Sequence, residues 1–284
     1  MNTIPPLNVE QLLRKYGLRP DKRIGQNYMQ DAKALEKIAM AAELTPTDTV
    51  LEIGPGLGSL TRFLSIAAQE VVAVELDPKL IPILHAILKT YVNVHVVHGD
   101  ILELTPKELG LPRNYLVAAN IPYNITSAII RHLIESEPKP RRMVLTVQKE
   151  VAERICAAPP EMSLLALSVQ VYGSPQIAGF ISADAFYPIP KVDSAVVKID
   201  IYTEPLIPPT FLPTFFRLIK AGFSQKRKTL RNSLSSGLEI PTTEAESLLE
   251  NVKIDSKRRA ETLNLGEWKL LCNALAEAQP ASKP

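Results

Sequence analysis

Three glycines fall within five positions of a chain that has only 12 glycines among its 284 residues. Gly54, Gly56 and Gly58 follow an apolar run that contains Glu52, and a helical pattern begins at Ser59. A strand, a glycine turn and a helix in this order let a ligand approach the backbone closely. Glu52 would repel a pyrophosphate, but it suits a ligand that carries an ammonium and a sulfonium, such as S-adenosylmethionine.

Two further acidic residues end the next two predicted strands. Glu75 closes the run EVVAVE, and Asp100 follows NVHVV in the motif HGDIL. Ligands of open parallel sheets bind beyond the carboxyl ends of the strands, so we expect both acids to meet Gly54 in one crevice. Glu75 is then placed for ribose hydroxyls and Asp100 for an adenine amino group. The set predicts a nucleoside-type cofactor.

The fourth predicted strand ends in the motif NIPY, which comprises Asn120, Ile121, Pro122 and Tyr123. The exocyclic amine of adenine is a poor nucleophile because its lone pair is delocalised into the ring. Two acceptors on its hydrogens, Asn120 Oδ1 and the Ile121 carbonyl, would draw it toward tetrahedral geometry. Pro122 cannot donate an N–H and fixes its own φ, and Tyr123 offers a flat face to an unstacked base.

A second aromatic candidate lies far downstream, in the loop FYPIPKVDS that joins the last two predicted strands. Phe186 is placed to close the other face of the base, and Tyr187 is the less favoured choice. An aromatic residue before proline also commonly packs a loop onto its own sheet. The sequence leaves both roles of Phe186 open.

The elements that must position these residues alternate along the chain. Short apolar runs predict strands at 49–53, 70–75, 93–97, 115–120 and 143–148, and helical patterns separate them, including one at 78–91. This alternation predicts a parallel sheet covered on both faces. Two further strands, 175–183 and 192–202, are joined by a loop, which permits an antiparallel pair at one edge. Asn8 and Asp31 are the expected caps of two helices that come first.

A proline-rich junction follows Glu204, and the remaining sequence reads as helices. We therefore predict two domains, a catalytic domain at 1–204 and a small helical domain at 205–284. No acidic residue occurs between Glu204 and Glu239, and Arg227 and Arg231 have the spacing of one helix face. Such a basic patch neutralises RNA phosphates. The candidate RNA-binding residues are Arg217, Lys220, Lys226, Arg227, Lys228 and Arg231.

Composition excludes several classes of protein. The formal net charge of +2 names no partner, and 46% hydrophobic with 22% charged residues is the ordinary globular average. Two distant cysteines exclude a disulfide framework and a cysteine-ligated zinc module. We expect no metal, no membrane insertion and no secretory signal, and a reducing cytoplasm fits best.

Together these motifs resemble the ribosomal RNA adenine N6,N6-dimethyltransferase family, and within it the bacterial members that act on small-subunit ribosomal RNA. The resemblance spans most of the chain: VLEIGPGLGSLT, VELD, GDIL, NIPY, FYPIPKVDSAVV, GQNYMQD at 25–31 and AGFSQKRKTLRNSL at 221–234. One departure is that Tyr28 and Met29 stand where the family commonly has Phe-Leu. It affects only contacts made through the Tyr28 hydroxyl.

The resemblance implies a Rossmann-like S-adenosylmethionine-dependent methyltransferase fold, with a seven-stranded mostly parallel sheet and an all-helical C-terminal domain. It implies two methyl transfers to N6 of each of two adjacent adenosines, in a hairpin near the 3′ end of the small-subunit RNA. The expected substrate is a small-subunit precursor, bound by a monomer. Gln26, Asn27 and Met29 would border the methionine end of the cofactor.

Two other functions remain open. A large-subunit RNA adenine methyltransferase of the antibiotic-resistance type shares the pocket motifs and differs in its substrate. A noncatalytic ribosome-assembly factor would keep the fold as a binding module, although the intact glycine turn and NIPY motif argue for catalysis.

Overall fold

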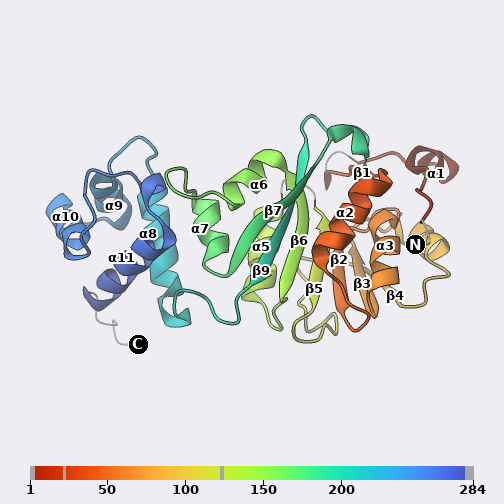
Figure 1. The fold of residues 1–284 in the computed structure, drawn as a ribbon, viewed down its shortest axis with the longest axis horizontal. Coiled ribbons are helices and arrows are strands. Elements are labelled where there is room, and N and C mark those ends of the chain that lie inside the picture. The colour runs from red at the N-terminus through yellow and green to blue at the C-terminus, as the bar shows by residue number, and fades with distance from the viewer. Residues whose placement is uncertain (1–3, 22–23, 122–124, 279–284) are drawn as a thin grey trace. The chain divides into compact units, whose positions relative to one another are not determined.

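A computed structural model describes residues 4–21, 24–121 and 125–278 of the chain (Figure 1). The chain divides into two compact units. The first joins Met1–Ala152 to Pro175–Ile201, and the second joins Glu153–Ser174 to Tyr202–Pro284. Residues 153–174 thus pack with the C-terminal helices, although they precede the predicted boundary at 204. The division at 204 into a catalytic and an RNA-binding domain remains a prediction.

The first unit is built on a seven-stranded sheet with the strand order β4-β3-β2-β5-β6-β9-β7. Strands β2 to β6 pair in parallel, and β9 pairs antiparallel with β6. The mostly parallel seven-stranded sheet predicted from the sequence is therefore confirmed. The strand bounds are β2 Thr49–Ile53, β3 Glu70–Glu75, β4 Val94–His98, β5 Leu116–Asn120, β6 Arg142–Gln148, β7 Gly173–Ile181 and β9 Ser194–Ile201.

The burial of each strand follows from its place in the sheet. Central strand β5 is a continuous apolar run whose first four residues are buried, as expected where helices cover both faces. Edge strand β7 instead alternates exposed and covered positions along Gly173–Ile181. A period of two is typical of a strand with one solvated face.

The helices of the first unit begin largely where their capping residues predict. Asn8 Oδ1 accepts the Gln11 N–H at 2.9 Å, and Asp31 Oδ1 accepts the Ala34 N–H at 2.7 Å. The predicted helix at 78–91 is shorter in the structure. The helix bounds are α1 Val9–Lys15, α2 Ala32–Ala42, α3 Ser59–Ala67, α4 Ile81–Ile87 and α5 Thr126–Glu135; α6, Lys149–Ile155, includes the boundary between the units after Ala152.

Helices α2 and α3 cover one face of the sheet, as Figure 1 shows at the right of the view. Leu35 and Ile38 of α2 and Leu64 of α3 are at most 2% exposed and pack on Val50 of β2. Burying each such side chain contributes about 1.5–3 kcal/mol. This packing fixes the start of α3, and with it the glycine turn that precedes α3.

A small second sheet was not predicted. Strand β1, Tyr28–Met29, pairs antiparallel with β8, Phe186–Tyr187, and the 3-10 helix η2, Ala183–Ala185, precedes β8. The N–H groups of Gln30 and Asp31 both bond to the Ala185 carbonyl. Residues 28–31, which precede the first long strand β2, are thus bound to the loop between the last two long strands, β7 and β9.

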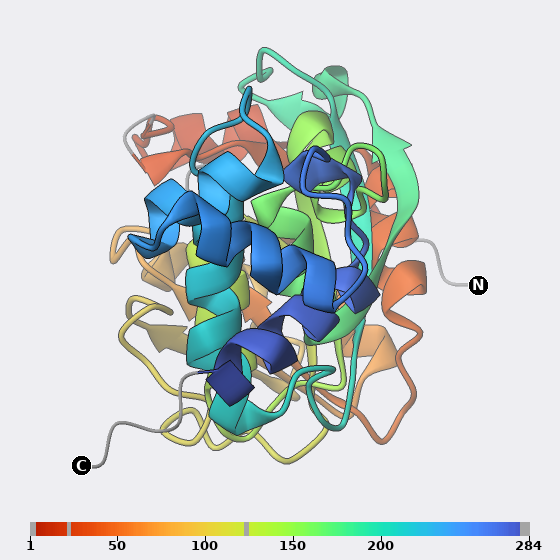
Figure 2. The same ribbon diagram turned by 90° about the vertical axis from the view of Figure 1, so that its left-hand side faces the viewer.

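The second unit is helical (Figure 2). Trp268 of α11 is fully buried and stacks on Phe223 of α8, with ring centroids 5.8 Å apart. Gly222 allows this approach, because a Cβ there would collide with the Trp268 ring. The bounds are α7 Leu164–Gln170, η3 Pro209–Phe211, α8 Leu212–Phe223, α9 Leu230–Leu238, α10 Thr242–Asn251, η4 Ala260–Thr262 and α11 Leu265–Ala278.

Candidate active site

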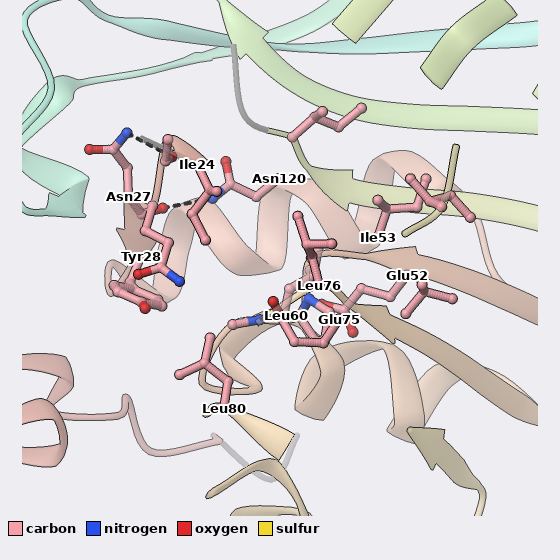
Figure 3. A pocket seen from close by; sticks show the side chains of 18 of the residues that line it. Ile24, Asn27, Tyr28, Glu52, Ile53, Leu60, Glu75, Leu76, Leu80 and Asn120 are labelled. Atoms are coloured by element: carbon pink, nitrogen blue, oxygen red, sulfur yellow. Dashed lines mark hydrogen bonds between the residues drawn. The ribbon is translucent and has the colours of Figure 1, made fainter. Parts of the chain in front are cut away.

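A cavity of about 230 Å³ opens at the carboxyl ends of β2, β3 and β5 and after β4 (Figure 3). Backbone bonds keep the strand ends together: the Gly54 N–H donates to the Val74 carbonyl at 2.9 Å, and the Gly99 N–H to the Glu75 carbonyl at 3.0 Å. Residues 24–29 form a further wall. The predicted crevice therefore exists, and Glu52, Gly54, Glu75, Asp100 and Asn120 all line it.

The glycine turn after β2 is left-handed at all three glycines. Gly54, Gly56 and Gly58 have φ of +68°, +61° and +80°, which other residues adopt only with strain. Gly54 and Gly56 line the cavity. Gly58 caps α3, and a Cβ there would come within 3.3 Å of the Leu88 side chain. The structure thus places Gly58 at a packing contact outside the cavity lining.

The Glu75 carboxylate holds the turn in place. Its Oε2 accepts the Gly56 N–H at 3.0 Å, and its Oε1 accepts the Asp77 N–H at 2.9 Å. A carboxylate has about four acceptor positions, so two amide bonds leave capacity for a ligand. Burial, partly offset by these amide bonds, raises the pKa of Glu75. The side chain is only 5% exposed.

Glu52 is the most deeply buried acid that lines the cavity, at 1% exposure. Its Oε2 has no hydrogen-bond partner among the described residues. Burial raises its pKa to about 8, and the nearby Glu75 adds to the rise, whereas Thr61 lowers it. A carboxyl group held near its point of ionisation favours a cationic neighbour.

The segment 24–29 contains three further predicted cofactor residues. Gln26 Nε2 donates to Asp77 Oδ2 at 3.0 Å, and Asn27 Nδ2 donates to the Gly25 carbonyl at 3.2 Å. Met29 is 3% exposed and lines the cavity with both of them. Asp100 accepts the Leu102 N–H at 2.9 Å, which orients its carboxylate at the cavity edge.

Asn120 ends β5, and its side chain is oriented by the opposite wall. Its Nδ2 donates to the Asn27 carbonyl at 3.0 Å, drawn as a dashed line in Figure 3. Oδ1 lies on the other side of the amide, and no hydrogen bond to it from a described residue is found, so it can serve as an acceptor. The Ile121 N–H bonds to the Thr146 carbonyl at 3.3 Å, and Ile121 lines the cavity. Pro122 and Tyr123 lie outside the described residues.

The Phe186 ring is buried and is not an open surface on which a base could stack. It is fully buried, pairs with Met29 across the small sheet and belongs to the core cluster beneath α2. The described residues that line the cavity do not include Phe186. Tyr187 is partly buried and packs near Tyr28. A contact between Phe186 and a target base remains a prediction.

The sequence missed two residues of the site. Tyr28 lines the cavity and lies over the glycine turn, and Asp77 anchors Gln26. Asp77 lies in the VELD motif, two positions after Glu75, so its closeness to the end of the strand could have identified it as a residue of the site. The motif GQNYMQD drew attention to the Tyr28 hydroxyl, but the position of Tyr28 over the turn depends on its cross-strand pair with Tyr187, which the sequence did not predict. Among the described residues, no group of three or more potential ligands could hold a metal ion.

The predicted RNA-binding residues divide into two environments within the second unit. Arg217, Lys220, Lys226, Arg227 and Lys228 are exposed. Arg231 NH1 pairs with Glu246 Oε1 at 2.9 Å, so its charge has a partner within the unit. The predicted helix face shared by Arg227 and Arg231 is wrong, because α9 begins only at Leu230 and Arg227 lies in the turn before it. In the part of the chain described, no helix has the length and apolar character needed to cross a membrane.

A family model described as ribosomal RNA adenine dimethylase matches residues 18–276. The chain belongs to this family. As a family member it is an S-adenosylmethionine-dependent methyltransferase of ribosomal RNA. The match covers both units, so the C-terminal helices are part of the family's common sequence.

Curated relatives of the family align over nearly their whole length. The chain is 45% identical to "Ribosomal RNA small subunit methyltransferase A" of Dehalococcoides mccartyi over 269 residues, which are 94% of this chain and 92% of the relative. It is 40% identical to the protein of the same description from Clostridium botulinum, over 95% of this chain and 98% of the relative.

Solved structures show the same fold. A dimethyladenosine transferase from Plasmodium falciparum has a TM-score of 0.73 and 28% identity, covering 86% of this chain and 95% of that one. The 23S rRNA methyltransferase ErmE has a TM-score of 0.72 and 28% identity, covering 87% and 99%. Both similarities confirm the Rossmann-like fold predicted for a family member.

Proposed function

We propose that this chain dimethylates N6 of two adjacent adenosines in a hairpin near the 3′ end of small-subunit ribosomal RNA. The substrate is a small-subunit precursor, and the protein acts as a cytoplasmic monomer in ribosome biogenesis. The observation that carries the proposal is the Asn120 amide, which the Asn27 carbonyl orients at the rim of a cavity lined by Glu52, Glu75 and Asp100.

The residues of the cavity fit S-adenosylmethionine. The glycine turn at Gly54 and Gly56 presents backbone without side chains, the Glu75 carboxylate retains acceptor capacity for ribose hydroxyls, and Asp100 stands ready for an adenine amino group. The buried, unpartnered oxygen of Glu52 suits a ligand with positive charge. When bound, S-adenosylmethionine supplies a methyl group activated by its sulfonium.

The chain's own residues prepare the target amine. Asn120 Oδ1 and the Ile121 carbonyl accept its two hydrogens, which localises the nitrogen lone pair toward the donor. Alignment in a closed site carries most of the rate enhancement, and a strong base is unnecessary because the methylated nitrogen loses its proton readily to water. A monomethylated amine keeps one hydrogen, so the second transfer engages one acceptor. Pro122 and Tyr123 are expected to support the base.

The choice of subunit rests on the relatives. Identities of 45% and 40% connect the chain to small-subunit methyltransferases over both lengths, whereas identity to the 23S enzyme ErmE is 28%. The TM-score of 0.72 to ErmE keeps large-subunit methylation as the second candidate. A noncatalytic assembly role is less favoured because Glu52, Glu75, Asp100 and Asn120 line one cavity, as a methyltransferase site requires.

Purified protein incubated with labelled S-adenosylmethionine and, separately, undermethylated small and large subunits tests the proposal. We expect N6,N6-dimethyladenosine in small-subunit RNA only. Asn120→Ala should abolish it, and Asn251→Ala, which removes the same atoms from the exposed end of α10, should not. Label confined to large subunits would establish the second candidate. Subunit binding without any methyl transfer would favour an assembly factor.

A further inference from the structure

The side chain of Tyr28 lies directly over the glycine turn. A Cβ added at Gly56 would be 3.0 Å from Tyr28 Cδ1 and 3.1 Å from Cε1, so the ring edge touches the bare Gly56 backbone. Tyr28 is 7% exposed and lines the cavity together with Glu75 (Figure 3). Gly56 belongs to the same lining. Packing with Leu57 and Leu80 accounts for the ring but leaves the phenolic hydroxyl unexplained.

Gly56 connects the ring to the predicted ribose acid. Its N–H donates to Glu75 Oε2 at 3.0 Å, so ring, turn and carboxylate form one contiguous group. Gln26 Nε2 bonds to Asp77 Oδ2 at 3.0 Å and fastens the segment that carries Tyr28 to the end of β3. The cross-strand pair with Tyr187 fixes the same segment from the other side. The ring is therefore held in place before any ligand arrives.

The electrostatic surroundings make the hydroxyl a donor. Burial raises the pKa of Tyr28, and the nearby carboxylates of Glu75 and Asp77 raise it further, so the phenol stays protonated at every physiological pH. Those carboxylates also repel an anionic ligand group from this corner, which disfavours the cofactor's carboxylate there. A neutral polyol is compatible with one phenol donor and one carboxylate acceptor.

We propose that the Tyr28 hydroxyl donates a hydrogen bond to the ribose of the bound nucleoside cofactor, opposite the Glu75 carboxylate. The inference rests on the proposed function only through the identity of the cofactor. It assigns the ribose subsite a donor from β1 as well as an acceptor from β3. Tyr28 is then a cofactor-binding residue.

Tyr28→Phe removes the hydroxyl and keeps the ring. Calorimetry on the full chain without RNA measures the affinity for S-adenosylmethionine and for 5′-methylthioadenosine, which has the ribose and adenine but lacks the amino-acid end. We expect both ligands to bind about 5- to 10-fold more weakly, the loss typical of one hydrogen bond. Tyr115→Phe is the matched control: its buried hydroxyl has no partner among the described residues and lies outside the cavity lining, so affinity should not change.

Methylthioadenosine analogues that lack the 2′- or the 3′-hydroxyl complete the test on the ligand side. If Tyr28 donates to one of these oxygens, the corresponding deoxy ligand should lose less affinity on Tyr28→Phe than the parent ligand does. An unchanged affinity for the parent ligands, or a loss confined to S-adenosylmethionine, would overturn the inference. Wild-type protein that binds neither ligand would instead refute the cofactor assignment of the proposed function.

Discussion

Replacing Gly56 with alanine tests whether the glycine turn is a packed structure or merely a permissive loop. The substitution places a side chain at φ +61°, in the left-handed region, and puts its Cβ 3.0 Å from the Tyr28 ring. Gly54→Ala makes the same change at φ +68° with no atom within 4 Å of the new Cβ. Gly110→Ala does so at φ +69° in a distant loop, again without a contact.

The three variants separate two costs. Left-handed backbone costs a non-glycine residue about 1–2 kcal/mol, and all three variants share this cost. Alanine also restricts the unfolded chain to a similar extent in each, so that effect cancels between them. Only Gly56→Ala must displace an aromatic ring, and overpacking of this kind costs about 1–3 kcal/mol more. We expect about 2–5 kcal/mol for Gly56→Ala and about 1–2 kcal/mol for each of the other two.

Hydrogen exchange of β2 and β3 amides during a urea titration measures these differences in the first unit. Fluorescence would not serve, because the single tryptophan, Trp268, lies in the second unit. S-adenosylmethionine affinity should fall most for Gly56→Ala, because a displaced Tyr28 ring disturbs the cavity wall. Equal loss of stability in Gly56→Ala and Gly54→Ala would refute the argument that ring and turn are tightly packed.

Four further predictions concern other residues. Ionisation of Glu52 costs the folded state more free energy than the unfolded state. The free energy of unfolding should therefore fall by up to about 1.4 kcal/mol per pH unit between pH 4.5, the ordinary pKa of the group, and about pH 8. The unfolding midpoint should fall less steeply with pH in Glu52→Gln than in the wild type, and parallel curves would contradict this. Lys228→Ala should weaken RNA binding and reduce the salt slope by about one, without changing the unfolding midpoint. Arg231→Ala should lower that midpoint by removing the cationic partner of Glu246, which keeps its hydrogen bond from Ser256, and thermal unfolding detects the change. Gly222→Ala should destabilise the second unit by displacing Trp268, and an unshifted Trp fluorescence transition would show otherwise.

The sequence predicted the long elements well because their patterns are local. Apolar runs located β2, which the glycine turn follows, and β3 and β5, which end at Glu75 and Asn120; a cap at Asp31 located α2. The rule for parallel sheets then brought Glu75, Asp100 and Asn120 to one edge. Each of these inferences needed only residues within one element and the order of elements.

The parts that the sequence could not predict depend on contacts between distant segments. Two-residue strands such as β1 and β8 have no periodicity to detect, so the covering of the turn by Tyr28 and the burial of Phe186 were invisible. The hydrogen bond from Asn120 to the Asn27 carbonyl likewise joins residues that are far apart in the sequence. Arg231 likewise looked free for RNA because Glu246 lies on another helix.

The pairing of β1 with β8 sets an order of events during synthesis of the protein. Residues 24–29 wall the cavity, yet their strand partner is translated about 160 residues later, which takes roughly 8–30 s at bacterial elongation rates. A nascent chain that has already formed β2 to β5 contains the partners of Gln26 and Asn27, Asp77 and Asn120, but it lacks the strand that pairs with Tyr28 and Met29. We therefore expect the wall formed by Tyr28, and with it full affinity for the methyl donor, to be completed only after β8 has been translated.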